Sequence, residues 1–183
     1  SLATGGILFL DELPEFSRAA LETLRQPLED REVTVSRVEA TVTYPANFQL
    51  VAAMNPCPCG HFPDLARCRC TEGQITRYLQ KISGPLLDRI DLCVEASPVT
   101  YGDVRGGGEN EASGAIRARV EQAREIQKER FMEENIRCNG EMSGRHIRKY
   151  CVLGKEEETF MEEVFEKLAL SARMHDRILK VAR

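Results

Sequence analysis

The sequence predicts an α/β fold in which a parallel sheet is followed by an all-helical part, and three observations indicate it. Two continuous apolar runs, Ile7 to Leu10 and Phe48 to Met54, are typical of strands buried in a parallel sheet. Between them, residues 32–44 alternate valines with hydroxyl side chains, as a β-hairpin does. From residue 115 onward, apolar residues recur at helical spacing. The 183 residues can bury one ordinary core or two small ones.

A helix is expected to follow the first strand. Ser17 is suited to be its N-cap, and Pro27 should end or kink it. The apolar residues expected on one face of this helix are Ala20, Leu21, Leu24 and Leu28.

The remaining strands are predicted from alternating apolar and polar residues and from the polar residues or prolines at which they stop. The turn of the 32–44 hairpin is expected near Arg37 to Glu39. The Phe48 to Met54 strand stops at Asn55, which Pro56 follows. Another strand is expected over Leu92 to Ala96.

The second half of the sequence is expected to be helical. Residues 98–114 are rich in Gly and polar side chains and predict a flexible linker between two subdomains, 1–97 and 115–183. Helices are expected over about 115–134, after Ser143, around 160–168 and from Ser171. In the first of these, the residues expected to face inward are Ile116, Val120, Ala123 and Ile126.

Composition and charge exclude several classes of protein. Apolar residues make up 42% and charged residues 30%, as in globular proteins, and no apolar run is long enough to span a bilayer. Because no secretory signal is visible and cysteines cluster, we expect a cytoplasmic protein with no membrane partner. The net charge of −4 means that any contact with nucleic acid requires a local basic patch.

Polar side chains follow the two apolar strands where each strand ends. Asp11 and Glu12 come directly after the first, and Asn55 follows the second. Parallel sheets bind ligands outside the carboxyl ends of their strands. An Asp that holds Mg²⁺ through water, beside a carboxylate that orients an attacking water, suits nucleotide hydrolysis. An isolated Asp-Glu or Asn-Pro pair is also common where a simple loop starts. Neither motif alone therefore shows that a nucleotide binds here.

Three motifs in order, ILFLDELPEF, VAAMNPCPCG and SGPLLDRIDL, resemble the magnesium-chelatase-like AAA+ ATPases of the ComM (YifB) type over nearly the whole chain. The resemblance implies the C-terminal part of an AAA+ (P-loop NTPase) core with a presensor-1 hairpin at 32–44, then a truncated helical lid. It implies that Asp11 and Glu12 are the Walker B pair, Asn55 sensor 1 and Arg89 the arginine finger. ATP and Mg²⁺ would be the ligands, in a ring of identical subunits, a hexamer.

Two arginines need separate consideration. A finger must be arginine because a planar, permanently charged fork best meets charge spread over phosphate oxygens. The alternative for Arg89 is local pairing with Asp88 or Asp91. A helix capped by Ser171 would place Arg173 in its first turn, where the family's pattern has sensor 2. The alternative there is a surface charge paired with Asp176.

Residues 56–72 contain four cysteines and are expected to form a loop with too few apolar residues to stabilise it by packing. Cys57, Cys59, Cys68 and Cys70 form C-x-C, eight residues, C-x-C. Four thiolates so placed can close a structural Zn²⁺ site, and His61 could replace one of them. Reduced cysteines in an irregular loop, or disulfides formed after purification, are the alternatives.

Three functions remain open from the sequence. The first is an ATP-dependent ring motor on DNA, which the ComM resemblance implies is a branch-migration helicase of natural transformation or recombination; Arg37 would be a phosphate contact, or only a solvated charge. The second is a metal-insertion ATPase of the magnesium chelatase type. The third is a non-enzymatic, zinc-stabilised nucleic-acid-binding module, whose basic residues would be Arg67, Arg69, Arg77 and Lys81.

The sequence lacks a G-x-x-x-x-G-K-[ST] phosphate loop, which in the family precedes the Walker B strand. We therefore expect this chain to be a fragment that shows negligible ATPase activity by itself in a phosphate-release assay. Steady turnover that Glu12→Gln abolishes would contradict this prediction.

Overall fold

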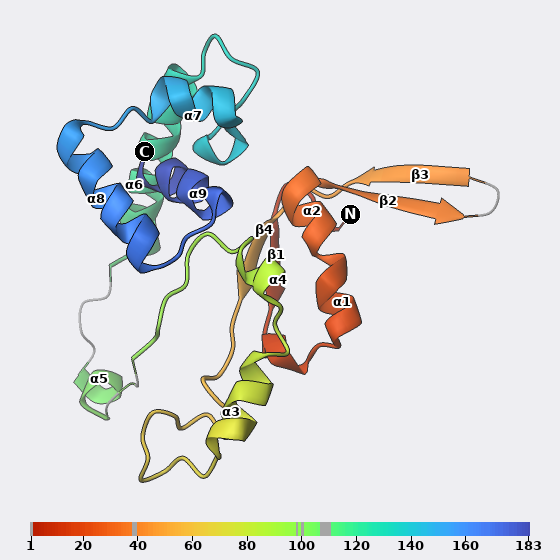
Figure 1. Ribbon diagram of the computed structural model, residues 1–183, viewed down its shortest axis with the longest axis vertical. Helices are drawn as coiled ribbons and strands as arrows, with labels where there is room; N and C mark the ends of the chain where they lie inside the picture. The colour runs from red at the N-terminus through yellow and green to blue at the C-terminus, as the bar shows by residue number, and fades with distance from the viewer. Residues whose placement is uncertain (1, 38–39, 98, 100, 107–110) are drawn as a thin grey trace. The chain divides into compact units, whose positions relative to one another are not determined.

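A computed structural model describes the chain except for residues 1, 38–39, 98, 100 and 107–110 (Figure 1). The chain divides into two compact units, Ser1–Ile90 and Asp91–Arg183, which are described separately. Over the described residues, we find no helix whose length and apolar character would let it cross a membrane.

The centre of the first unit is a parallel pair of strands. β1 (Ile7–Leu10) lies beside β4 (Gln49–Ala52), with Leu10 opposite Ala52. The predicted parallel pairing is confirmed. β4 is shorter than the predicted run of Phe48 to Met54, because its residues paired with β1 run only from Gln49 to Ala52.

Only one face of this sheet is covered. Leu8 and Leu10 are half-buried on that face, whereas Ile7 and Phe9 on the other are 63% and 58% exposed. The expectation of strands buried on both faces is therefore wrong for the described residues. The core packs against one face alone and consists of Leu13, Leu21, Ile82 and Leu86, with Leu10, Leu24 and Leu28 at its margin.

A short 3₁₀ turn, η1 (Leu13–Glu15), leads into two helices, α1 (Arg18–Thr23) and α2 (Arg25–Asp30). The Ser17 hydroxyl accepts a hydrogen bond from the Ala20 N–H at 3.2 Å, which confirms the N-cap. The predicted interruption occurs at Leu24, so Pro27 lies in the first turn of α2, where N–H groups have no intrahelical partner. Ala20 is exposed, contrary to expectation.

Residues 32–45 form the expected antiparallel strands, β2 (Glu32–Arg37) and β3 (Ala40–Pro45), with Val35 opposite Val42. The turn residues 38–39 lie outside the described residues. The hairpin extends away from the rest of the first unit (Figure 1), and most of its side chains are exposed on both faces.

The loop after β4 leads to α3 (Glu72–Leu79) and α4 (Gly84–Leu87). Thr71 and Gln74 form a reciprocal capping box that fixes the start of α3. The predicted strand over Leu92 to Ala96 is wrong, because these residues join no ladder within the described chain. An extended segment becomes a strand only when its backbone groups find partners, and Leu92 and Val94 are exposed.

The second unit is helical, as predicted. Its elements are α5 (Tyr101–Gly106), α6 (Ser113–Arg130), η2 (Asn139–Glu141), α7 (Gly144–Tyr150), α8 (Lys155–Lys167) and α9 (Ala172–Ala182). Its core consists of Phe131, Met142, Ile147, Cys151 and Leu179. The expected linker, 98–114, is described only in part, since 98, 100 and 107–110 lie outside the described residues and α5 occupies its middle.

The apolar face of α6 is not inward. Ile116, Val120 and Ile126 are 43%, 47% and 51% exposed, and Ala123 is exposed as well. The prediction of an inward face is therefore wrong, because the core of this unit begins only at Phe131, after α6 has ended.

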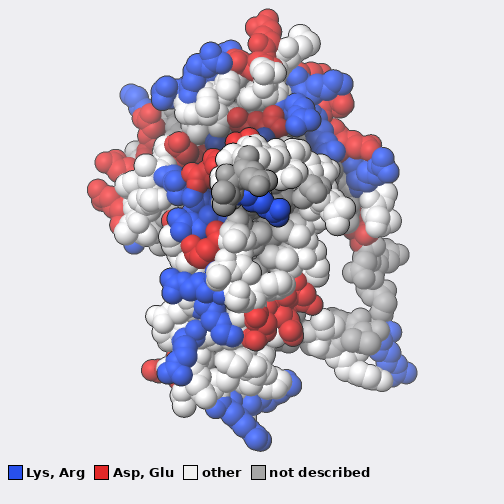
Figure 2. Space-filling view, turned by 90° about the vertical axis from the view of Figure 1, so that its right-hand side faces the viewer, with Lys and Arg blue, Asp and Glu red and all other residues white. Residues whose placement is uncertain are grey.

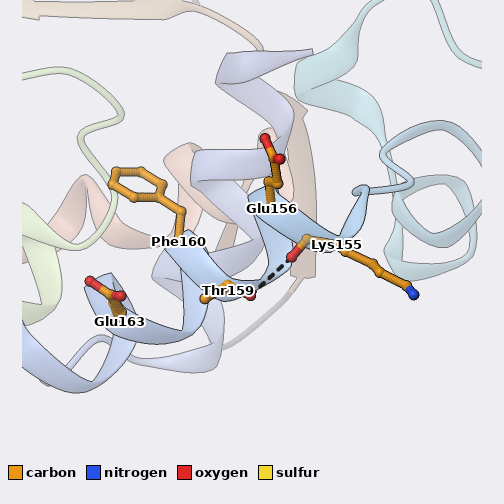
Figure 3. A pocket seen from close by; sticks show the side chains of 5 residues that line it. All are labelled: Lys155, Glu156, Thr159, Phe160 and Glu163. Atoms are coloured by element: carbon orange, nitrogen blue, oxygen red, sulfur yellow. Dashed lines mark hydrogen bonds between the residues drawn. The ribbon is translucent and has the colours of Figure 1, made fainter.

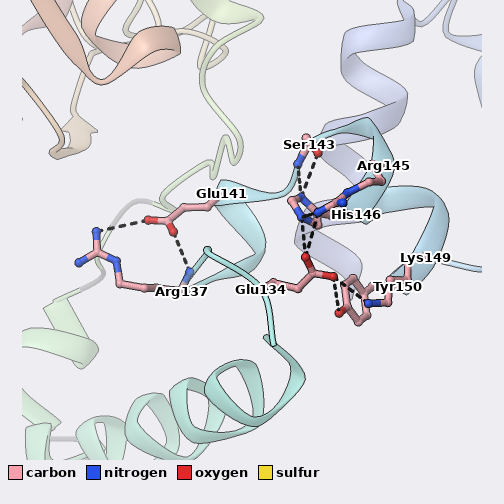
Figure 4. Close-up of polar contacts among 8 residues, drawn as sticks. All are labelled: Glu134, Arg137, Glu141, Ser143, Arg145, His146, Lys149 and Tyr150. Carbon is pink, nitrogen blue, oxygen red and sulfur yellow. Dashed lines mark hydrogen bonds and ion pairs between the residues drawn. The ribbon is translucent and has the colours of Figure 1, made fainter. Parts of the chain in front are cut away.

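A partly buried glutamate organises the polar side of the second unit (Figure 4). Glu134 accepts hydrogen bonds from Lys149 at 2.7 Å, Arg145 at 3.0 Å and the Tyr150 hydroxyl at 3.2 Å. The hydrogen bond from Lys149 is the largest of the effects that lower the pKa of Glu134 to about 2. His146 Nδ1 accepts the Ser143 N–H at 3.0 Å, and its Nε2 lies 3.3 Å from a carboxylate oxygen of Glu134.

We predict that the second unit loses stability in acid because of Glu134. An unfolded glutamate takes up its proton near pH 4.5, whereas the folded carboxylate resists protonation down to about pH 2. The stabilisation is therefore complete above about pH 4.5 and is lost as the pH falls toward 2. Glu134→Gln should flatten this part of the profile of melting temperature against pH. The neighbouring exposed Glu133→Gln is the control, and an equal effect of both changes would contradict the assignment.

Candidate functional site

The ends of β1 and β4 lie together because their hydrogen bonding continues past both strands. The Leu10 carbonyl accepts the Ala53 N–H at 2.9 Å, and the Leu13 N–H donates to the Ala53 carbonyl at 3.0 Å. Asp11 and Glu12 are therefore held as a two-residue projection beside Ala53, and Asn55 follows two residues later. The backbone thus brings the three predicted residues to one edge of the sheet, the edge at which parallel sheets bind ligands.

Glu12 has a left-handed backbone conformation, with φ 50° and ψ 48°. This conformation costs a residue other than glycine about 1–3 kcal/mol and is concentrated at functional sites. The Asp11 carboxylate accepts the Glu12 N–H at 2.9 Å, which helps to hold the bend. All three polar side chains, those of Asp11, Glu12 and Asn55, are exposed. The edge can therefore receive a ligand without first moving a covering segment.

Tyr78 of α3 joins this edge, and the sequence analysis missed it. Its side chain is buried, and burial raises the pKa of its hydroxyl. The charges of Glu15 and Glu12 raise this pKa further, while the backbone N–H of Asn55 lowers it. The hydroxyl therefore lies close to both strand ends. A buried tyrosine needs a partner for its hydroxyl, but nothing in the local sequence indicates which partner that is.

Arg89 is folded back onto its own unit. Its guanidinium forms an ion pair with Glu29 of α2 and donates from Nη1 to the Pro85 carbonyl at 2.5 Å. The side chain is 8% exposed, and its buried Nε has no hydrogen-bond partner among the described residues. Its acidic partner is thus neither Asp88 nor Asp91. The predicted role of Arg89 as a finger stays a prediction.

The other predicted arginines lie elsewhere. Ser171 accepts the Met174 N–H at 3.2 Å, which confirms it as the N-cap and places Arg173 in the first turn of α9, in the second unit. Asp176 contacts His175 at 3.1 Å. Arg37 is exposed at the end of β2, opposite Ala40 and next to the hairpin turn.

The four cysteines of the loop after β4 converge. The sulfurs of Cys57, Cys59, Cys68 and Cys70 all lie within 4.8 Å of one another, and every one of these thiols is free. Individual pairs are separated by 3.4 to 3.8 Å. Tetrahedral zinc with Zn–S bonds near 2.3 Å requires sulfurs about 3.8 Å apart. The cluster therefore fits zinc, and His61 is not among the residues of the group.

Ionisation of the cluster also favours a cation. Backbone N–H groups of Arg69 and His61 lower the pKa of Cys59 to about 6. Burial raises the pKa of Cys70 to about 12. One thiolate is thus available near neutral pH, and neighbouring negative charge opposes the next. A divalent metal removes this opposition and releases the remaining protons.

The cluster is adjacent to Asn55. Gly60 has φ +77°, and a Cβ placed there would lie 3.7 Å from the Asn55 Oδ1 atom. The Gly60 N–H donates to the Cys57 carbonyl at 3.0 Å, and the Cys57 side chain is fully buried. A metal that fixes Cys57 would therefore also restrict the segment that carries Asn55.

Among the described residues of the second unit, the surface is hollowed on two helices. One hollow lies on α8 (Figure 3), where Lys155, Glu156, Thr159, Phe160 and Glu163 surround it, and the other lies along α6. Each is lined by a single helix, so neither brings together groups from separate elements, and we assign neither a ligand.

Comparison with known proteins relates both units to one family. Residues 1–104 match the model for magnesium chelatase, subunit ChlI, and residues 110–183 match that for the ChlI C-terminal part. The chain is 46% identical over its full length to the competence protein ComM of Haemophilus influenzae and to YifB of Salmonella typhimurium. It is 45% identical to YifB of Escherichia coli. In each case it spans 35% of the relative's length.

We predict that protein purified in reductant contains one zinc per chain, measured by elemental analysis. Chelation should lower the melting temperature, since metal binding contributes directly to the stability of a loop with little core. Cys57→Ser should abolish metal retention, whereas Cys93→Ser, an exposed cysteine outside the cluster, should leave it unchanged. Metal-free protein with an unaltered melting temperature would exclude the zinc site.

Proposed function

The chain belongs to the magnesium chelatase ChlI family, and on this premise we propose that it is part of an ATP-hydrolysing ring motor that acts on DNA. The observation that carries the proposal is the juxtaposition of Asp11 and Glu12 with the segment of Asn55 at one edge of the parallel pair. An edge with two carboxylates and an amide suits a metal-bound triphosphate.

Each residue at this edge has a distinct task in the proposal. Mg²⁺, when bound, would neutralise charge on the phosphate oxygens. Asp11 would hold the metal through water, and Glu12, which is exposed and has a left-handed backbone conformation, would orient the attacking water. Asn55 would position that water or the terminal phosphate by hydrogen bonding. Arg173, in the first turn of α9, would sense the same phosphate.

Arg89 would act on the nucleotide of a neighbouring subunit. Its ion pair with Glu29 must then open when the ring assembles, since the guanidinium is almost fully buried against its own unit. The phosphate oxygens of the neighbour's nucleotide would replace the Glu29 carboxylate. Bidentate phosphate binding is a strong charge-assisted interaction, which makes the exchange favourable.

Two observations favour DNA as the polymer. The H. influenzae relative is named a competence protein, and the β2–β3 hairpin presents exposed faces with Arg37 at its end. The family description itself favours the alternative, a metal-insertion ATPase. A four-cysteine loop is an additional structural element that metal insertion into a porphyrin does not require.

Complementation between two inactive variants of the full-length protein tests the site. Glu12→Gln subunits should bind ATP without turnover but still offer their arginine, whereas Arg89→Ala subunits should lack only the arginine. Each alone should lose roughly 10³-fold or more in turnover. Mixing the two should restore activity, because some interfaces then combine an intact Glu12 with an intact Arg89.

Glu29→Gln is the control for a structural role of Arg89, because it removes the ion pair and keeps the arginine. It should retain most of the activity. Activity that mixing never restores, with Glu29→Gln as inactive as Arg89→Ala, would reject the finger. DNA should stimulate the wild-type ring, and Arg37→Ala should reduce that stimulation. Stimulation by a porphyrin and a divalent metal, without any by DNA, would favour the alternative.

A further inference from the structure

The loop after β4 and α3 carry three exposed arginines that the proposed ATPase site does not use. Arg67, Arg69 and Arg77 are exposed, and we call their side chains the arginine face. Among the described residues, the ion pairs of the first unit involve other cations, such as Lys81 with Glu15 and Arg25 with Glu22. None of the three arginines of this face forms an ion pair with an acidic side chain of the described residues.

The cysteine cluster sets the direction of the Arg69 side chain, and a backbone hydrogen bond anchors Arg67 nearby. Cys68 and Cys70 turn their sulfurs toward the cluster, so Arg69 between them points the other way, as alternate residues of an extended segment do. The Arg69 backbone N–H faces the Cys59 sulfur, and the Arg67 N–H donates to the Asp64 carbonyl at 3.2 Å. The backbone is thus anchored while the charged ends remain outside.

Local charge is positive although the chain as a whole is negative. Residues 56–81 contain four Lys and Arg against two Asp and Glu, within a chain of net charge −4, and only Lys81 of the four pairs with an acid, Glu15, outside this stretch. One of the two acids, Asp64, already accepts the Ala66 N–H at 3.0 Å. Lys and Arg side chains gather at the lower end of the view in Figure 2, where Figure 1 places α3 and the loop before it.

Exposed apolar side chains lie among these charges. Phe62 is 40% exposed and Leu65 is 82% exposed, both in the same loop. Surfaces that bind single-stranded nucleic acid combine cationic side chains along the backbone with aromatic rings on which bases stack. A loop that serves only to enclose a metal has no need of either feature on its outer side.

We propose that the arginine face is a second nucleic-acid contact, in which Arg67, Arg69 and Arg77 bind successive phosphates of a single strand and Phe62 stacks on a base. The inference rests on the proposed function only for the identity of the polymer. The contact lies on a different element from the β2–β3 hairpin, so a strand held at both places would be gripped at two separate points of one subunit.

The competing explanation is that the arginines neutralise the negative charge of the metal centre. Zinc bound by four thiolates carries a net charge of about −2, which nearby arginines would neutralise. If that were their task, loss of Arg67 and Arg69 would weaken metal retention and leave nucleic-acid binding at saturating zinc unchanged. The two explanations therefore predict opposite results in two separate measurements.

The test uses the full-length protein with Arg67→Gln and Arg69→Gln combined. Anisotropy of a labelled single-stranded oligonucleotide, measured over a range of salt concentrations, should show affinity reduced on the order of tenfold. The slope of log K against log salt should become shallower by about 1.4, at about 0.7 per lost phosphate contact on a single strand. Zinc content should equal that of the wild type.

Arg117→Gln with Arg119→Gln is the matched control. These arginines have the same spacing and are exposed, but they pair with Glu121 and Glu111. The control should leave the salt slope unchanged. An unchanged slope in the Arg67 and Arg69 variant, or an equal loss in the control, would overturn the proposal.

Failure of the proposed motor and failure of this inference give different results. If DNA stimulates hydrolysis but the salt slope of the variant is unaltered, the proposed role of the arginine face is rejected and the proposed motor is retained. If the variant has a shallower salt slope but DNA does not stimulate hydrolysis, the proposed role of the arginine face is retained and the proposed motor is rejected. A duplex probe serves as a second arm, and tighter binding of duplex than of single strand would contradict the role of Phe62.

Discussion

The parallel pairing of β1 with β4 is the constraint on which the candidate site depends. The register sets Leu10 opposite Ala52, and the bonds made by Ala53 carry the pairing one step further. Asp11 and Glu12 can project at the edge only because Leu10 and Leu13 are both tied to that one residue. Slipping the register by one position would turn every side chain of a strand to the opposite face. It would also separate the acidic pair from Asn55.

The cysteine loop extends this constraint toward α3. Cys57 begins it two residues after Asn55, and the loop ends at the capping box of Thr71. Closing such a loop costs chain entropy that a small apolar content cannot offset, and a metal ion held by the four cysteines would supply the missing free energy. Tyr78 then completes the connection, because its buried hydroxyl returns to the neighbourhood of Asn55 and Glu12. The strand ends, the cysteine cluster and α3 are therefore connected, and disturbing the cluster should also disturb the edge that carries Asp11, Glu12 and Asn55.

The sequence predicted what local patterns encode. Apolar runs, caps and turn residues gave β1, the hairpin strands and the helices that start after Ser17, Ser143 and Ser171. It failed where structure depends on a distant partner. Residues 92–96 have a strand's composition but no neighbour in the described chain, and α6 has an amphipathic pattern without a covering surface. Tyr78 was missed for the same reason, since its importance arises from groups that only the fold brings near.

Arg89 pairs with a residue that is distant in the sequence, and its motif alone does not predict this partner. Its neighbours in sequence, Asp88 and Asp91, suggested a local pair, yet the carboxylate that holds it is Glu29, 60 residues earlier. This pairing leaves its buried Nε without a partner, and such a group costs about 1–3 kcal/mol. A phosphate, which can accept from several guanidinium donors at once, would satisfy the side chain better than Glu29 and Pro85 do. In the proposed ring, a subunit without a neighbour's nucleotide would thus keep the Arg89 Nε unpaired. The nucleotide would gain part of its binding free energy by supplying the missing hydrogen-bond acceptor.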